Sequence, residues 1–358
     1  MSRHTRRTFS KRDAGSKSCR FASRLSRRQL IAGLTGVPFV GGLMLEVLKK
    51  RGWASFEEEL LLAQQESSGQ EKADAITRSG KNDSLARLED LKGKVPKGKI
   101  GKVEVSRLIL GGNLIGGWAH ARDLVYVSPL VQAYHTREKI YETFRLAEAS
   151  GVNTFLTNPI LCPAITDYWK DEGGKIQFIS DCGGRTLSEG IKKSIDQGAC
   201  ACYLHGSRSD GAVAREDFDL IEQSLELIRR NGLPAGIGAH RLHTVEACVE
   251  RGYQPDFWMK TLHHTDYWSA KAETERNNIW CRKPEETVAF MKDLQQPWIA
   301  YKTLAAGAIR PEEGFKYAFE NGADFLCVGM FDFQIVQDAN IALGVLDGDL
   351  DRQRPWYA

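Results

Sequence analysis

Short runs of apolar, β-branched and aromatic residues recur along the chain beyond residue 100, and each is followed by a stretch with helical periodicity. Successive runs are spaced by roughly 30 residues, the length of one strand–helix unit. Continuous apolar runs are typical of parallel strands that are covered on both faces. The expected strands lie at 108–113, 152–158, 176–181, 199–205, 235–240, 257–262, 298–304 and 325–330.

The stretches between these runs carry helix-end signals. Apolar spacing predicts helices at 137–149, 187–197, 215–230, 244–251, 284–294, 311–320 and 334–343. Residues suited to helix termini stand at their ends, namely Gly151, Gly198, Gly232, Gly252 and Gly322 as C-caps and Pro284 and Pro311 in first turns. No G-x-G-x-x-G motif follows the first strand, and residues 101–358 have the length of a closed barrel. The predicted fold class is therefore α/β, a (β/α)8 TIM barrel with an N-terminal signal and a polar spacer.

The first 55 residues have the pattern of an export signal. Ser26-Arg27-Arg28-Gln29-Leu30 precedes a glycine-rich apolar run that is too short for a comfortable membrane span, and this arrangement resembles a twin-arginine signal. The resemblance implies passage through the twin-arginine translocation machinery and a place in the periplasm or at the outer face of the inner membrane. Lys49 and Lys50 follow the apolar run, so cleavage and an uncleaved anchor both stay open. Residues 56–100 are mostly polar and predict a partly disordered spacer.

Composition and charge narrow the possible partners. The 358 residues are 42% apolar and 27% charged, with a net charge of +3. Arg and Lys concentrate in the N-terminal signal region, so the rest is near neutrality and we expect no nucleic-acid partner. Most of the eight cysteines lie in apolar runs, which is typical of buried free thiols. Cys200-x-Cys202 has no second pair, so a structural zinc site is not favoured.

Polar residues stand at most of the expected strand ends, where TIM barrels carry their active sites. These residues are Asn113, Asn158, Asp181, His205, His240, Lys260, His263, Lys302 and Asp332. We predict four catalytic residues among them, His205, Lys302, Lys260 and Asp181. Lys302 follows an apolar run and is expected to point into the barrel, where burial lowers the pKa of an amine. For each histidine alone, a hydrogen-bonded core or loop role is the alternative.

The same strand ends predict a metal site and a substrate site. His205, His240 and Asp181 come from three successive strands and suit a divalent metal ion, with His263 as the alternative ligand. Long aromatic loops follow the first and sixth strands and are typical of walls around a ring-bearing substrate, or of a dimer contact. The predicted substrate-binding residues are Asn113, Trp118, Asn158, Tyr267, Trp268 and Asp332.

Four segments resemble the aldo/keto reductases. Residues 151–155 stand where the family has its second strand. Residues 103–112 resemble the family's opening, where a short hairpin closes the barrel floor before the first strand. Tyr203-Leu204-His205 resembles its fourth strand with the histidine, and residues 302–307 resemble its seventh. The resemblance covers the whole barrel and implies NAD(P) as the cofactor, with an Asp, Tyr, Lys and His catalytic set.

This sequence departs from that catalytic set. Only the histidine is retained, as His205, whereas the aspartate, tyrosine and lysine positions fall on Leu156, near Leu161 and on Cys182. The family's basic cofactor-binding segment is replaced by residues 331–334, which include Asp332.

Several functions follow from these residues. The first is an exported enzyme that acts on a small carbonyl or carbohydrate substrate by acid–base or metal-assisted chemistry, as an isomerase, lyase or hydrolase. In its metal-free form, Lys302 or Lys260 stabilises an enolate while a histidine moves the proton. The alternatives are a divergent NAD(P)-dependent oxidoreductase, a Schiff-base aldolase that uses Lys302, and a binding barrel without catalysis.

Overall fold

The computed structural model describes residues 86–122, 124–271, 278–352 and 354–358. The predicted twin-arginine signal and the spacer up to residue 85 lie outside these residues. No helix in the described part of the chain is long and apolar enough to cross a membrane.

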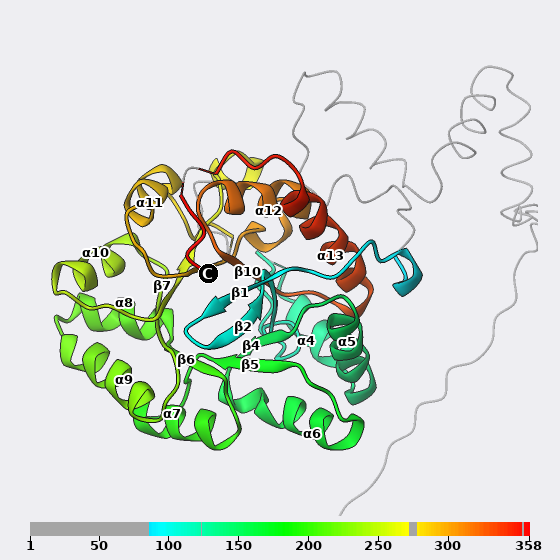
Figure 1. Ribbon diagram of the computed structural model, residues 1–358, viewed down its shortest axis with the longest axis horizontal. Coiled ribbons are helices and arrows are strands. Elements are labelled where there is room, and N and C mark those ends of the chain that lie inside the picture. Colours follow the sequence, from blue (N-terminus) through cyan, green and yellow to red (C-terminus); the bar gives the residue numbers. More distant parts are fainter. Residues whose placement is uncertain (1–85, 123, 272–277, 353) are drawn as a thin grey trace, which may run out of the picture. The chain divides into compact units, whose positions relative to one another are not determined.

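Eight parallel strands close into a barrel, as the apolar runs predict (Figure 1). Each strand pairs with its neighbours in chain order, and the last strand pairs with the first. The strands are β3 (Leu108–Gly111), β4 (Thr154–Thr157), β5 (Gln177–Ser180), β6 (Ala201–Leu204), β7 (Ala235–Ala239), β8 (Phe257–Thr261), β9 (Trp298–Tyr301) and β10 (Phe325–Val328). The predicted (β/α)8 fold class is therefore confirmed.

Side chains along each strand alternate between two buried environments. One set fills the barrel interior and includes Ile179, Tyr203 and Met259. The other set, which includes Phe178 and Trp258, packs against the surrounding helices. Burial on both faces explains the continuous apolar runs in the sequence. It also fixes the side to which each residue at a strand end is directed.

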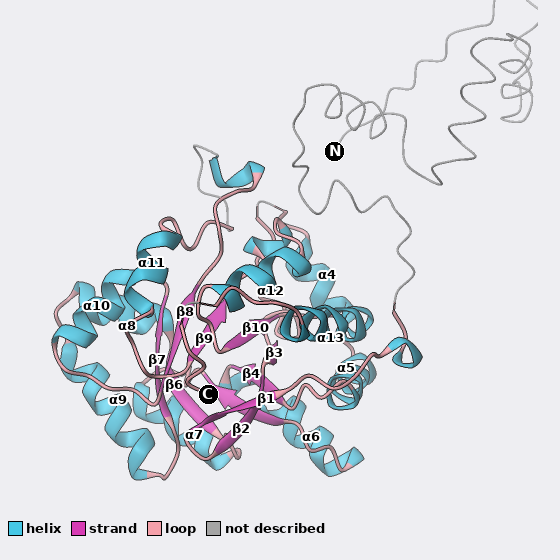
Figure 2. Cartoon of the chain, turned by 45° about the horizontal axis from the view of Figure 1, so that its top comes forward, coloured by secondary structure: helices cyan, strands magenta, loops and turns pink. Residues whose placement is uncertain are grey.

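Helices surround the barrel (Figure 2). They are α4 (Val127–Tyr134), α5 (Arg137–Ala149), α6 (Cys162–Glu172), α7 (Leu187–Asp196), α8 (Gly206–Ala214), α9 (Phe218–Arg230), α10 (Leu242–Glu250), α11 (Pro284–Met291), α12 (Pro311–Glu320) and α13 (Asp332–Asp347), with single 3-10 turns η1 (Leu88–Asp90), η2 (Pro159–Leu161), η3 (Trp268–Lys271) and η4 (Ala305–Gly307). The five predicted C-cap glycines all have a left-handed φ.

Three helices were not predicted. α4 lies within the first long loop, and α6 follows β4. α8 lies between β6 and α9, where no helix was expected. α8 contains Gly206 and Gly211 and several serines, which are weak helix formers. It is held by tertiary contacts, among them a hydrogen bond from the Ser209 hydroxyl to the carbonyl oxygen of Gly238 on β7.

A hairpin and the C-terminus cover the floor of the barrel, at the N-terminal ends of the strands. β1 (Lys97–Ile100) and β2 (Val103–Ser106) pair antiparallel and lie across the ring in Figure 1, with the C-terminus beside them. Ile100 and Val105 insert into the barrel interior. The floor hairpin implied by the aldo/keto reductase resemblance is present. Because β1 starts at Lys97, the predicted spacer boundary at residue 100 falls inside this hairpin.

Candidate active site

Five polar side chains meet at the mouth of the barrel. Asn158, Asp181, His205 and His240 each directly follow the last residue of β4, β5, β6 and β7, and Lys302 directly follows β9. On β4, β5 and β6 the residue at this position is directed inward, because the apolar residue two places earlier lies in the barrel interior. On β9, Ile299 lies in the interior and Ala300 packs against the helices, so alternation alone would direct Lys302 outward. The expectation that alternation points Lys302 into the barrel is therefore wrong, and its left-handed φ of 61° interrupts the alternation. The structure thus brings together three of the four predicted catalytic residues.

His240 is held by a carboxylate from α8. Asp210 accepts hydrogen bonds from the His240 ring Nδ1 at 2.9 Å and from the Thr244 hydroxyl at 2.7 Å. Burial alone would raise the pKa of Asp210, but these hydrogen bonds outweigh it and the pKa lies below its usual value. With Nδ1 donating to a carboxylate, Nε2 of His240 is left as a proton acceptor.

His205 has the opposite tautomer. Its Nδ1 accepts a hydrogen bond from the backbone N–H of Ser207 at 3.2 Å, so a neutral ring carries its proton on Nε2. Burial, together with the positive charge of neighbours that include Lys302 and Arg208, lowers the pKa of His205 to about 4. The ring is therefore neutral at physiological pH and presents an N–H donor. The centroids of the His205 and His240 rings are 6.1 Å apart.

Asp181 is a partly buried carboxyl whose pKa is raised. Asn158 donates from Nδ2 to Asp181 Oδ1 at 3.0 Å, and the backbone N–H of Gly183 donates to the same oxygen at 2.8 Å. Desolvation by burial exceeds the effect of these hydrogen bonds and raises the pKa of Asp181 to about 6. This carboxyl can therefore accept and release a proton near neutral pH.

Lys302 lies among aromatic rings. Its Nζ is 2.5 Å from Nε2 of His120 and 3.7 Å from the centroid of the Trp280 ring. Within the described residues, Lys302 forms no ion pair with a carboxylate. Burial lowers the pKa of Lys302 to about 7, so the amine changes protonation in the physiological range.

Two site residues stand beside or within strained backbone. Lys302 has φ of 61°, and Cys182, which follows Asp181, has φ of 53°. A residue other than glycine in the left-handed region costs about 1–2 kcal/mol. Backbone strain of this kind is concentrated at functional sites, where the surrounding structure holds it in place.

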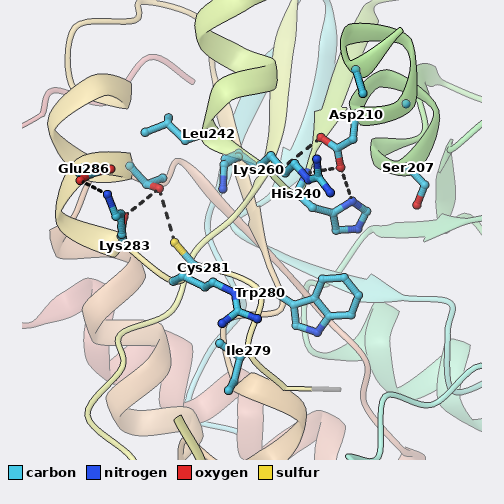
Figure 3. Close-up of a pocket in the computed structure, with 15 residues that line it drawn as sticks. Ser207, Asp210, His240, Leu242, Lys260, Ile279, Trp280, Cys281, Lys283 and Glu286 are labelled. Carbon is cyan, nitrogen blue, oxygen red and sulfur yellow. Dashed lines mark hydrogen bonds and ion pairs between the residues drawn. The ribbon is translucent and has the colours of Figure 1, made fainter. Parts of the chain in front are cut away.

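Lys260, the fourth predicted catalytic residue, lies outside this cluster. On β8, Phe257 and Met259 face the barrel interior and Trp258 faces the helices, so Lys260 also faces the helices. Its side chain lines a pocket beside the mouth, which Figure 3 shows with His240 and Trp280 on its wall. The sequence could not show which face of this fully buried strand points inward.

The predicted metal ligands do not form a metal site. Among the described residues, no three His, Cys, Asp or Glu side chains are grouped closely enough to hold a metal ion. His240 Nδ1 is taken by Asp210, and Asp181 is paired with Asn158. In the alternative ligand His263, Nδ1 bonds the carbonyl oxygen of His264, and Nε2 accepts the backbone N–H groups of 280 and 281. His263 therefore fastens the loop that carries Trp280.

The predicted substrate-binding residues are divided among several places. Asn158 lies in the cluster, and Asn113 and the 42% exposed Trp118 lie on the loop after β3. Tyr267 is buried, and its hydroxyl donates to the carbonyl oxygen of residue 278, so it secures its own loop. The side chain of Trp268 lies outside the described residues. Asp332 binds Tyr134 and Lys139 between α4, α5 and α13, and is not part of the cluster.

Sequence reasoning missed Asp210, the residue that orients His240. It lies on α8, in a stretch whose glycines and serines gave no helical signal. His120 and Trp280 stood out in the sequence only as members of long aromatic loops, because nothing local indicates that both meet Lys302.

Comparison with known proteins supports the fold. No protein-family model and no curated protein matches the sequence. The solved structure of a Pseudomonas aeruginosa protein assigned to the aldo-keto reductases aligns with a TM-score of 0.50 at 14% identity, over 72% of this chain and 99% of that one. A truncated 3-deoxy-D-arabino-heptulosonate 7-phosphate synthase from Thermotoga maritima aligns with a TM-score of 0.43 at 10% identity, over 71% of this chain and 93% of that one. At 14% identity, the first of these alignments shows a likeness of barrel fold alone.

The segment after β10 does not fit the phosphate groups of NAD(P). Asp332 places a carboxylate in the first turn of α13, where a phosphate would need a cationic or neutral surface. The ring of Phe331 stacks on that of Phe333, with centroids 5.2 Å apart, so these side chains supply no cation.

Proposed function

We propose that this protein is a barrel enzyme that moves protons on a small carbonyl or carbohydrate substrate by metal-free acid–base chemistry, as an isomerase or a lyase does. One observation supports the proposal above the others. His205 and His240 follow neighbouring strands with opposite tautomers, one offering an N–H donor and the other a lone pair. A donor and a base that face one mouth are what proton abstraction next to a carbonyl requires.

The proposed step begins at the base. Nε2 of His240 takes a proton from the carbon next to the carbonyl, and the electron pair of that C–H bond forms a C=C bond. The carbonyl π electrons move to oxygen, and the developing enolate is stabilised by the Lys302 ammonium and the Nε2–H of His205. Asp210 stabilises the imidazolium that forms.

A proton must then return to the substrate. Asp181, with a pKa of about 6, can deliver one to the enolate oxygen or to a leaving group. For an isomerisation, the Asp181 carboxylate formed in this way takes the proton of the hydroxyl on the adjacent carbon, where the new carbonyl forms, and His240 returns its proton to the former carbonyl carbon. Reprotonation at that carbon gives an isomerase, and loss of a leaving group next to the enolate gives a lyase.

Solvent exchange tests this proposal without knowledge of the net reaction. The full chain is incubated in D2O with a panel of small hydroxy-aldehydes and hydroxy-ketones, and the proton next to the carbonyl is followed by NMR. We expect exchange with at least one substrate and a fall of about 10²–10⁴-fold in its rate for His240→Gln. His243→Gln is the matched control, because that side chain is 76% exposed on α10, three residues further along the chain. An unchanged exchange rate in His240→Gln would refute the assignment of the base.

A Schiff-base aldolase is the second candidate, and the lowered pKa of Lys302 favours it. An amine with a pKa of about 7 is partly neutral at physiological pH and can attack a carbonyl carbon, releasing water as the C=N bond forms. Borohydride reduction in the presence of a ketone substrate should then add the mass of the substrate less one oxygen atom at Lys302, because water is lost and two hydrogens are gained. The proton-transfer mechanism predicts no adduct.

We further propose that the enzyme acts outside the cytoplasm, on the basis of the twin-arginine pattern at Arg27 and Arg28. Replacing both arginines with lysine should retain the protein in the cytoplasmic fraction. Equal export of the two forms would contradict the proposal.

A further inference from the structure

A pocket of about 660 Å³ lies beside the barrel mouth. It is bounded by α8, the start of α10, the end of β8, residues 279–283 and α11. Two of its lining residues, His240 and Trp280, also belong to the mouth cluster, since their rings contact each other at 5.2 Å and Trp280 carries Lys302 on its face. The pocket and the mouth therefore share part of their walls.

The charges that line the pocket are mainly positive. Its four cationic side chains are Arg241, Lys260, Arg282 and Lys283. Its two carboxylates are already engaged, Asp210 by His240 and Thr244, and Glu286 by Lys283 at 2.7 Å. In Figure 3 the Lys283–Glu286 pair lies on the side of the pocket away from Asp210 and His240, with Lys260 between them. With Arg282 left aside, the lining has three cations and two carboxylates, so it carries a net positive charge.

Lys260 is the most deeply buried of these cations. Its side chain is 1% exposed, and Nζ donates to the carbonyl oxygen of Thr261 at 2.9 Å and to the Thr261 hydroxyl at 2.8 Å. An ammonium has three protons to donate, and no described residue accepts the third. Burial lowers the pKa of Lys260 to about 8, so the group is charged at neutral pH. A buried charge with an unused donor is costly unless a partner is supplied.

We propose that this pocket binds an oxyanion of the substrate, a carboxylate or a phosphate group, through Lys260 and Arg241. The inference rests on the proposed function, because it names the class of substrate that reacts at the mouth. The substrate is then a hydroxy-carbonyl compound with an acidic end. Its anion is held between α8 and α11, and its carbonyl extends past Trp280 toward His205 and Lys302.

Direct binding of simple anions tests the inference independently of turnover. Inorganic phosphate and acetate are titrated separately into the full chain by calorimetry, so that the two arms distinguish a phosphate from a carboxylate. We expect at least one to bind, with Kd raised about tenfold or more in Lys260→Met, because a charge-assisted hydrogen bond is lost. Arg241→Ala, at the pocket surface, should weaken the same binding and guards against a folding defect in the buried variant.

Two further variants separate this inference from the proposed function. Lys302→Met should bind the anion as the wild type does, and Lys192→Met, which alters a 74% exposed lysine, is the matched control. Anion binding that depends on Lys260, without proton exchange on any acidic hydroxy-carbonyl, would support the pocket while refuting the proposed function. A second outcome would refute the anion site but not the proposed function. In it, exchange occurs equally on neutral substrates, and anions either do not bind or lose binding only in Lys302→Met.

Discussion

The floor and the mouth of this barrel differ in how many hydrogen-bond and ion-pair partners their charged groups have. At the floor, the fully buried Asp324 accepts hydrogen bonds from Arg352 at 3.2 Å and Arg354 at 2.6 Å. The backbone N–H groups of Trp298 and Tyr357 occupy its remaining lone pairs. Three of these four contacts join the C-terminal segment to the start of β10, and the fourth joins the start of β9 to that of β10. This network fastens the floor of the fold.

At the mouth, charged and titratable groups are buried with much less compensation. Lys302 faces aromatic rings and an imidazole, and burial lowers its pKa to about 7. Desolvation likewise raises the pKa of Asp181 to about 6 and lowers that of His205 to about 4. These residues cost stability, and perturbed groups of this kind cluster where chemistry occurs. The comparison teaches that a buried carboxylate whose lone pairs are all paired, such as Asp324, holds the fold together, whereas titratable groups with fewer partners at the mouth are placed for chemistry.

Asp324→Asn should have the largest effect on stability. It leaves Arg352 and Arg354 buried without their carboxylate, so we expect the free energy of unfolding to fall by about 3–5 kcal/mol. Urea denaturation of the full chain measures this change. The control is Asp196→Asn, whose side chain is 54% exposed and pairs with Lys192, and for which we expect a loss below about 1 kcal/mol. Equal losses in the two variants would mean that the Asp324 network stabilises the fold no more than an exposed ion pair does.

Lys302→Met should lower activity without lowering stability. Removing an uncompensated buried amine leaves the melting temperature unchanged or higher, whereas loss of the enolate-stabilising charge lowers kcat/KM by about 10²–10³-fold. Thermal unfolding and the exchange assay are measured on the same preparation. A variant that is both unstable and inactive would mean that Lys302 supports the fold, as Asp324 does.

The barrel could be predicted from the sequence because its strands are buried on both faces. That burial leaves apolar runs such as 176–181, and positions at their ends such as Asp181 and His205 follow from the alternation of side chains. Helix propensity served less well at α8, where glycines and serines are held in a helix by contacts with β7. The fold could therefore be predicted where the burial pattern repeats along the chain, but not where tertiary contacts override local helix propensity.

The site could be predicted only in part, for the same reason. Strand ends converge whatever the loops do, so His205, His240 and Lys302 could be grouped in advance. The partners that set their chemistry come from elsewhere in the fold, and the sequence does not indicate which helix or loop supplies them. Asp210 fixes the tautomer of His240 from α8, and Trp280 reaches Lys302 from a loop that His263 holds in place.

The alkaline limb of the pH profile should identify the form of Lys302 that acts. If the ammonium stabilises the enolate, kcat/KM falls about tenfold per pH unit above the pKa of about 7, because the charged form is lost. Lys302→Arg keeps a charge at all these pH values, so its profile, although lower, should stay flat through that range. A wild-type rate that rises through pH 7 would instead favour the neutral amine and the Schiff-base aldolase.

Asp338 on α13 is another buried acidic group, and its substitution should have a smaller effect on stability than that of Asp324. Its side chain is 3% exposed, no described residue donates a hydrogen bond to it, and burial raises its pKa to about 7. The folded state thus binds this proton more tightly than the unfolded state does. The resulting stability is complete below the unfolded pKa of about 4 and is lost as pH rises through about 7.

Asp338→Asn, which mimics the protonated form, should raise the free energy of unfolding by about 1–2 kcal/mol at pH 8 and by much less at pH 5. Denaturation curves at the two pH values measure the difference, and exchange activity should not change because the residue lies outside the mouth cluster. A gain of equal size at both pH values would mean that the carboxylate is not the group that titrates.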